Sequence, residues 1–192
     1  MAQAAAGRVV MSVDCTALLN LRHYTDPTAA GADEEGRVSW MTEYPHDLDD
    51  TMSFDEVTRY PAADHDSGDG ERMAIVTYGN GVVTALQAVA QLPPDQARGV
   101  TVIDSPYLSS VPGQLREAMG DFDAVLFAEI CKDGPGAPLL SHACALHNEG
   151  VLPKGGRWGT VAAARAYNPL GNTITFLGEE VILDGLQKLR EQ

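Results

Sequence analysis

Basic residues are scarce in this sequence. Its 192 residues include 13 Lys and Arg against 27 Asp and Glu, which gives a formal net charge of -14. The few basic residues are scattered and form no cluster that would hold phosphate groups. A chain of this charge repels nucleic-acid backbones and anionic lipid headgroups. We therefore expect neither a nucleic-acid-binding nor a membrane-surface function.

Cysteine is also rare, and no apolar run is long. Cys15, Cys131 and Cys144 are irregularly spaced and odd in number, which fits reduced thiols inside a cell better than a disulfide framework. No apolar segment approaches the roughly 20 residues that span a bilayer. The start of the chain lacks the apolar core of a secretory signal and the repeated arginines of a transit peptide. We expect an intracellular protein, with mitochondrial and cytoplasmic locations both open.

The first part of the chain, residues 1–71, is predicted to be an acidic, irregular extension. Acidic runs such as Asp33–Glu35 and Asp47–Asp50 bury little surface and repel themselves, so long ordered elements are not expected there. Three short apolar islands interrupt the acid. The pattern allows a strand at residues 8–13, and residues 38–41 and 52–54 are candidates for docking on a partner surface.

The second part, residues 72–192, follows a linker at residues 61–70 that is dense in turn-forming residues. Here short apolar runs alternate with segments of helical period, which is typical of strands covered on both faces by crossover helices. Strands are expected at residues 73–78, 99–104, 123–129 and 160–164, and helices at residues 82–92, 114–119, 138–147 and 179–189. Right-handed connections between them predict a small, mostly parallel sheet between layers of helices.

Four motifs occur in order in this second part: Ile75–Gly79, Gly99–Asp104, Ala124–Glu129 and Gly134–Ala137. Their order resembles the C-terminal domain of the beta subunits of thiamine-diphosphate-dependent 2-oxoacid dehydrogenases, and of transketolase. The resemblance covers about residues 72–190. It implies a three-layer α/β/α sandwich with a small, mostly parallel five-stranded sheet. In that family the domain packs against a pyrimidine-binding domain and helps to form the oligomer interface.

The resemblance also implies what this chain does not carry. In those oxidoreductases and transferases, the catalytic glutamate and the groups that hold thiamine diphosphate and magnesium lie in two other domains. Gly68-Asp69-Gly70 looks like part of a diphosphate motif, but it lies in the linker and no Asn-Asn pair follows it. The expected function is therefore a non-catalytic assembly domain that binds no cofactor or metal by itself. Its partner would be a thiamine-diphosphate-binding subunit or domain, or another copy. Whether the chain is part of a longer subunit or a repurposed domain stays open.

The sequence departs from the family after two of the strands. Ser105–Ser110 replaces an arginine-containing, leucine-rich turn, and Cys131–Asp133 replaces the glycines that usually follow the strand-ending glutamate. Both segments follow strand C-termini, where open α/β sheets place their ligand and partner contacts. The fold expectation is unaffected, but the interface and complex are left open.

The same edge supports an alternative function, a free-standing protein that binds a small anion or regulates a partner. Gly79-Asn80-Gly81 at a helix start exposes N–H groups to an anion, although a simple turn would need the same residues. Thr84 stands where a dinucleotide fingerprint has its third glycine, and Asp104 keeps a nucleotide-dependent enzyme as a third alternative. The candidate anion or partner site comprises Gly79, Asn80, Gly81, Asp104, Glu129, Gly134 and Gly136.

Three further groups have bland and functional interpretations. Glu129 is either a perturbed carboxylate that moves protons or a strand-end acid that caps the following turn. His142, Cys144 and His147 are spaced so that their side chains leave one helix in different directions, which makes them poor ligands for a single zinc ion. Cys131 beside Lys132 invites a reactive-thiol hypothesis, but the sequence places no base or oxyanion site beside it. No catalytic residue is assigned.

Overall fold

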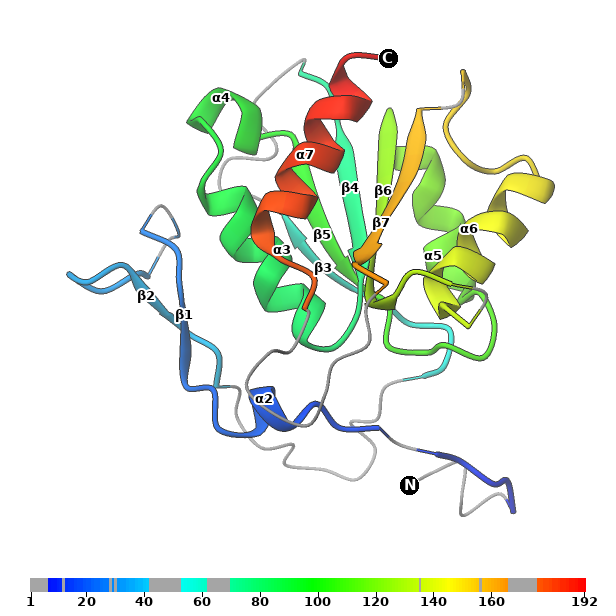
Figure 1. The fold of residues 1–192 in the computed structure, drawn as a ribbon, viewed down its shortest axis with the longest axis horizontal. Coiled ribbons are helices and arrows are strands. Elements are labelled where there is room, and N and C mark those ends of the chain that lie inside the picture. The colour runs from blue at the N-terminus through cyan, green and yellow to red at the C-terminus, as the bar shows by residue number, and fades with distance from the viewer. Residues whose placement is uncertain are drawn as a thin grey trace.

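The fold is a mostly parallel sheet with helices on both faces (Figure 1). The computed structural model describes residues 7–11, 13–27, 29, 31–41, 53–61, 70–134, 136–155, 157–165 and 176–192. The main sheet has five strands in the order β3-β5-β4-β6-β7. Their bounds are Thr58–Pro61 (β3), Met73–Thr77 (β4), Val100–Asp104 (β5), Ala124–Lys132 (β6) and Trp158–Ala163 (β7). β3 is antiparallel to β5, and the other pairs are parallel.

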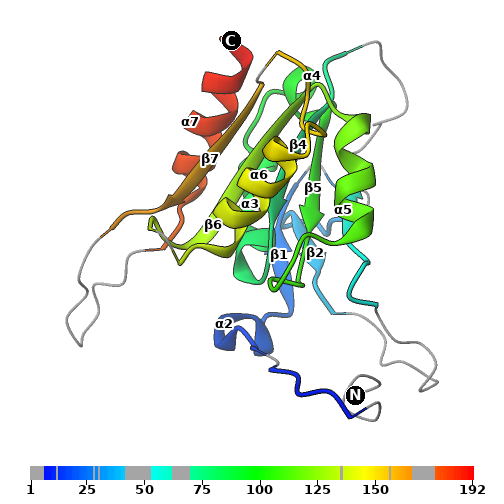
Figure 2. The same ribbon diagram turned by 90° about the vertical axis from the view of Figure 1, so that its right-hand side faces the viewer.

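Helices cover the two faces of this sheet. Asn80–Ala90 (α3) and Glu179–Arg190 (α7) pack on one face, with the buried side chains of one core cluster between. Gly113–Ala118 (α5) and Pro138–Asn148 (α6) pack on the other face, over a second core cluster. Figure 2 shows the sheet between these layers, with Pro94–Ala97 (α4) beside α3, and a short 3-10 turn at Met119–Asp121 continues α5. The expected α/β class and five-stranded, mostly parallel sheet are confirmed.

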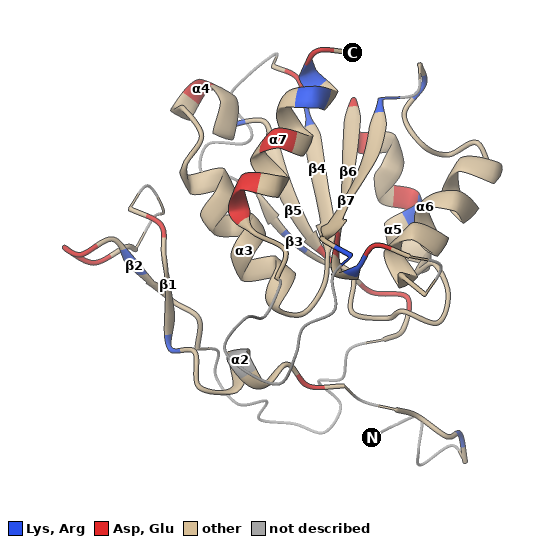
Figure 3. Ribbon diagram, in the orientation of Figure 1, with Lys and Arg blue, Asp and Glu red and all other residues tan. Residues whose placement is uncertain are grey.

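Burial explains why the central strands are continuous apolar runs in the sequence. Every residue of β4 is buried, as are the first four of β5 and the first six of β6. A strand covered on both faces has no solvent side on which to alternate polar residues. The four strands and four helices expected after residue 72 all form, with ends displaced by at most three residues. The charges of α7 match the helix dipole, with acidic residues in its first turn and basic residues in its last (Figure 3).

The fifth strand comes from the part of the chain expected to be irregular. β3 pairs with β5 along its whole length, from Thr58 opposite Asp104 to Pro61 opposite Thr101. A proline ends this strand, which an edge strand tolerates because one of its sides needs no donors. The predicted domain boundary between residues 71 and 72 thus lies between β3 and β4, two strands of the same sheet. Most of the linker, residues 62–69, with Gly68 and Asp69 of the Gly-Asp-Gly sequence, lies outside the described residues.

The N-terminal part adds small elements. Thr16–Leu19 forms one helical turn (α2), and His23–Thr25 (β1) pairs antiparallel with Arg37–Ser39 (β2). The sequence pattern allows a strand at residues 8–13, but this expectation is wrong for the residues of that segment that the structure describes. Arg8–Met11 and Val13 lie in no strand. Apolar content alone does not make a strand, because its backbone groups need a neighbour with which to pair.

The apolar islands expected to dock on a partner contact this chain instead. Trp40, directly after β2, packs against the α3 and α7 core cluster, with its ring stacked on Tyr60 of β3. Phe54 stacks on Tyr107, with ring centroids 4.6 Å apart. Met52 lies outside the described residues. In the part of the chain that the structure describes, no helix is long and apolar enough to cross a membrane.

Gly81 sets how closely α3 approaches the sheet. A Cβ atom at this position would lie 2.5 Å from the Ile130 side chain and closer still to the Thr77 hydroxyl. That hydroxyl donates to the Ala128 carbonyl at 2.8 Å, so it is held in place across β4 and β6. Only glycine allows the first turn of α3 to sit at this distance.

Substitution of this glycine tests the packing. Gly81→Ala should lower the free energy of unfolding by about 1–3 kcal/mol, because overpacking forces the helix or the Thr77 side chain to move. Gly136→Ala is the matched control, since a Cβ there meets nothing within 4 Å, and its effect should stay within about 0.5 kcal/mol. Denaturant unfolding of both variants measures the difference. Equal stability of the two would contradict the close approach.

Candidate functional site

The predicted site residues lie where the parallel strands end. β4 ends at Thr77 opposite Asp104, the last residue of β5, and β6 passes beside them. Gly79, Asp104 and Glu129 therefore share one edge of the sheet, the edge at which α3 begins (Figure 1). Their side chains differ in direction, because alternate residues of a strand face opposite sides. Glu129 faces α6, whereas Asp104 is on the face covered by α3.

The Gly79-Asn80-Gly81 turn uses its first N–H groups internally. Gly79 has φ of 55° and ψ of -132°, a conformation that favours glycine. The N–H of Gly81 donates to the Tyr78 carbonyl at 3.1 Å, and the N–H of Val82 donates to the Gly79 carbonyl at 3.2 Å. Two donors that an anion would need are thus already engaged. This geometry agrees with the turn interpretation of the motif.

Glu129 is a buried carboxylate whose oxygens are held by three donors. Its exposure is 3 %. Oε1 accepts from the Tyr78 hydroxyl at 2.6 Å and from the Cys131 N–H at 2.8 Å, and Oε2 accepts from the Leu139 N–H at 2.9 Å. Leu139 is in the first turn of α6, where N–H groups have no partner within the helix. Glu129 therefore caps α6, in agreement with the structural interpretation.

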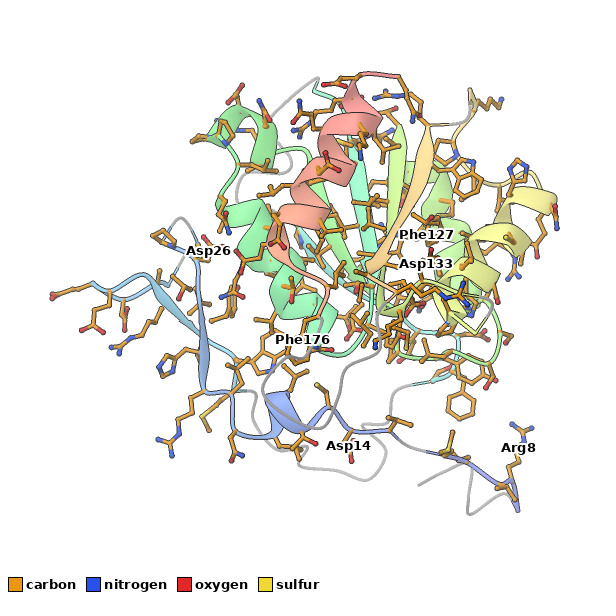
Figure 4. All side chains as sticks on the ribbon, in the orientation of Figure 1. Arg8, Asp14, Asp26, Phe127, Asp133 and Phe176 are labelled. Atoms are coloured by element: carbon orange, nitrogen blue, oxygen red, sulfur yellow. The ribbon has the colours of Figure 1, made fainter. Side chains whose placement is uncertain are left out.

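The loop between β6 and α6 encloses little free space. A cavity of about 20 Å³, room for roughly one water molecule, is lined by residues that include Phe127, Glu129 and Asp133. Figure 4 shows Phe127 and Asp133 close together on the α6 side of the sheet. Gly134 accepts from the Ala137 N–H at 3.1 Å, and the space beside Gly136 is open. The Gly134 and Ala137 backbone contact agrees with the turn interpretation of this motif.

The histidines and cysteines are dispersed. His142 is buried, whereas Cys144 and His147 are exposed, so the three side chains do not converge. Among the described residues no group of His, Cys, Asp and Glu side chains is arranged to hold a metal ion. Burial lowers the pKa of His142, against opposing effects of the Leu108 carbonyl and the Glu129 carboxylate. The exposed thiol of Cys131 lies 3.3 Å from the Tyr78 hydroxyl.

Asp104 differs from Glu129 in that one of its two oxygens has no donor among the described residues. Its Oδ1 is buried and makes no hydrogen bond within the described part of the chain. Burial raises the pKa of this carboxyl to about 6, because removal from water penalises the charged form. Ser105, the next residue, is also fully buried, with no described partner for its hydroxyl. The donors around Glu129 are already engaged, and Oδ1 of Asp104 has none, so this edge offers few free donors to an anion within the described part of the chain.

Comparison with known proteins does not assign a family. The sequence matches no protein-family model and none of the curated proteins searched. The transketolase-like assignment therefore stays a prediction from the four motifs.

Sequence reasoning missed the partners of the predicted residues. Tyr78, which donates to Glu129, lies 51 residues earlier in the chain. The aromatic group formed by Tyr24, Trp40 and Tyr60 comes from three separate strands or strand ends. Spacing along the chain carries no signal for either arrangement, since both depend on how strands pair in the fold.

Replacement of Glu129 by glutamine tests its capping role. A glutamine amide in this place would turn its own N–H donors toward at least one of the three donors that now face the carboxylate. Glu129→Gln should therefore cost about 1–3 kcal/mol of unfolding free energy. Tyr78→Phe, which removes one hydrogen bond, should cost about 0.5–1.5 kcal/mol. Denaturant unfolding measures both, and an unchanged stability of Glu129→Gln would show that the carboxylate is not structural.

The carboxyl of Asp104 should make stability depend on pH. Its folded-state pKa of about 6 lies above the unfolded value of 3.8, so the folded state binds more protons between these values and stability falls as pH rises through that window. Asp104→Asn should remove this loss, with a gain at pH 7.5 of up to roughly 3 kcal/mol that disappears near pH 3.5. Unfolding of both proteins across this pH range is the measurement. A constant difference would contradict the assignment.

Proposed function

We propose that this chain is a non-catalytic assembly domain of a thiamine-diphosphate-dependent 2-oxoacid dehydrogenase, as part of its beta subunit, or of a transketolase-like enzyme. Thiamine diphosphate and magnesium are carried by the partner domain or subunit. Support comes from the four motifs: the first three lie on strands β4, β5 and β6 of one mostly parallel sheet, and the fourth lies in the segment that follows β6. The domain contributes a surface for assembly and no reacting group.

The observation that carries this proposal is a set of exposed apolar side chains beyond that edge. The exposed fractions are 85 % for Met11, 79 % for Val13, 69 % for Leu19 and 63 % for Phe176, and Val9 is fully exposed. Figure 4 shows Arg8 and Asp14 on the N-terminal segment below the sheet and Phe176 nearer to the sheet, and Figures 1 and 2 both show α2 on that side of the molecule. We call Val9, Val10, Met11, Val13, Leu19 and Phe176 the apolar end surface.

Such a surface fits contact with another protein. Single exposed apolar residues are ordinary, but a group of them at one end of a molecule is typical of an interaction site. Val9, Met11 and Val13 occupy alternate positions in the sequence, and none of the three lies in a strand. Burial of each side chain in an interface would contribute about 1.5–3 kcal/mol. The ligand-like groups at the same edge, by contrast, are engaged in the fold.

Affinity capture of the full chain from its native cell extract tests the function. We expect the wild-type chain to recover a thiamine-diphosphate-binding subunit, identified by mass spectrometry and by the cofactor it releases. The triple variant Val9→Ser, Met11→Ser, Val13→Ser should recover at least roughly tenfold less, because three interface side chains lose their apolar contact.

Met41→Ser is the matched control. Met41 is also exposed, at 69 %, but follows β2 and is outside the apolar end surface. Its recovery of the subunit should equal that of the wild type. A wild-type chain that recovers no thiamine-diphosphate-binding protein would overturn the assembly function. Equal recovery by the triple variant would show that the interface lies on another surface of the chain.

A further inference from the structure

The buried histidine of α6 has no hydrogen-bond partner in the described part of the chain. His142 has an exposure of 3 %, and neither of its ring nitrogens makes a hydrogen bond there. A neutral imidazole carries one donor and one acceptor, which are normally satisfied when the ring is buried. His142 shares the buried face of α6 with Leu139, Ala143 and Leu146. These three belong to the core cluster on that face of the sheet, so the polar ring lies against an apolar surface.

The connection between β5 and α5 packs on the same core cluster. Its residues Leu108 and Val111 are half-buried against that cluster, and the Leu108 carbonyl is near enough to His142 to act on its pKa. Residues 106–112 form no helix or strand. No hydrogen bond between backbone groups joins residues 106–111 to another described residue. We call residues 106–112 the flap.

Hydrogen bonds anchor the chain on either side of the flap. Before it, the Ser105 N–H donates to the last carbonyl of β4 at 2.8 Å. After it, the Gly113 N–H donates to Oδ1 of Asp55 at 3.1 Å. The flap itself is held by side chains, through its apolar contacts with the core and through the ring of Tyr107, which stacks on Phe54. A segment with fixed ends and few backbone hydrogen bonds is typical of the parts of a protein that open locally.

One charged group acts on the ring, and burial outweighs it. Within the described residues, the Glu129 carboxylate of β6 is the charge that acts on the pKa of His142, and together with the Leu108 carbonyl it favours the imidazolium. Burial has the larger effect and lowers the pKa. The positive charge of Arg116 on α5 is paired with Glu149. The other titratable side chains of the elements around the ring are those of Tyr78, Tyr107, Glu117, Cys131, Lys132, Cys144 and His147. The closed flap therefore favours the neutral ring.

We propose that the flap is released by acid, through protonation of His142. When the ring takes up a second proton, it becomes a cation with two N–H donors, and burial of an unpaired cation is costly. Movement of the flap gives the ring access to water, and no helix or strand hydrogen bond has to break. Opening also uncovers the hydroxyl of Ser105, which is fully buried without a partner among the described residues. This inference concerns the chain by itself and does not depend on the proposed assembly function.

The direction of the pKa change sets the pH range of the release. An exposed imidazole has a pKa of 6.5, and burial lowers the pKa of His142 in the closed state. The open state therefore binds more protons than the closed state below pH 6.5, so the closed state loses stability as the pH falls through this value. The ratio of open to closed chains should rise by up to about tenfold for each pH unit.

Methyl NMR of the purified full-length chain follows the flap between pH 7.5 and pH 5.0, with a soluble paramagnetic agent that broadens the signals of solvent-exposed methyl groups. Leu108 and Val111 report on the flap. Leu186, which is buried in the core cluster on the other face of the sheet, reports on global unfolding. The imidazole signal of His142 gives its protonation. Every chain carries Asp104→Asn, because that carboxyl titrates in the same range, with a pKa of about 6.

In the chain that keeps His142, the methyl groups of Leu108 and Val111 should become exposed as the ring is protonated. The open fraction at pH 5.0 should be at least roughly tenfold above that at pH 7.5, while Leu186 stays shielded. His142→Gln cannot take up a proton, so its flap should be as closed at pH 5.0 as at pH 7.5. His142→Leu, which also lacks the proton site and keeps an apolar contact with the core, should give the same result.

His147→Gln is the matched control. It removes the exposed histidine of the same helix and should leave the acid release unchanged. The proposal is overturned if the Leu108 and Val111 methyl groups stay shielded at pH 5.0, or if they become exposed to the same extent in a folded His142 variant. Exposure of Leu186 together with the flap would also overturn it, because the whole domain would then unfold.

Discussion

The buried carboxylate of Glu129 organises the edge at which the strands end. A carboxyl group at 3 % exposure requires hydrogen-bond partners, and three donors supply them. The donors come from the end of β4, from β6 itself and from the start of α6. One group therefore fixes how two neighbouring strands and a helix meet.

The edge has two sides of opposite chemical character. On the α6 side, Glu129, Tyr78 and the first turn of the helix form a satisfied network with almost no free space. On the α3 side, Asp104 is partly buried, and its Oδ1 has no donor within the described part of the chain. Because alternate residues of a strand face opposite sides, residues from adjacent strand ends enter different environments. The shared position of Asp104 and Glu129 along the edge thus does not make them one site.

The predictability of this structure follows from which interactions are local. The central strands and their helices were predicted because burial on both faces leaves continuous apolar runs, as in Ala124–Ala128, and because Pro138 is suited to a first helical turn. β3 was missed, since an edge strand in an acidic segment shows little apolar signal and ends in Pro61. The choice between the two interpretations of Glu129 required Tyr78 and Leu139, which reach it only through the fold. The sequence pattern made Trp40 a candidate for contact with another protein. In the structure its ring stacks on Tyr60, which belongs to the missed strand, so this contact within the chain could not be predicted.

The origin of β3 has a consequence for the integrity of the sheet. A chain that began at residue 72 would keep every central strand but would lack residues 58–61, which cover the outer side of β5. The backbone groups of Val100–Asp104 would then face solvent along a strand made almost entirely of buried residues. Such an edge is a template for pairing with other chains and for aggregation. The acidic segment thus protects the sheet from intermolecular strand pairing, and solubility of the folded part depends on residues that precede its predicted boundary.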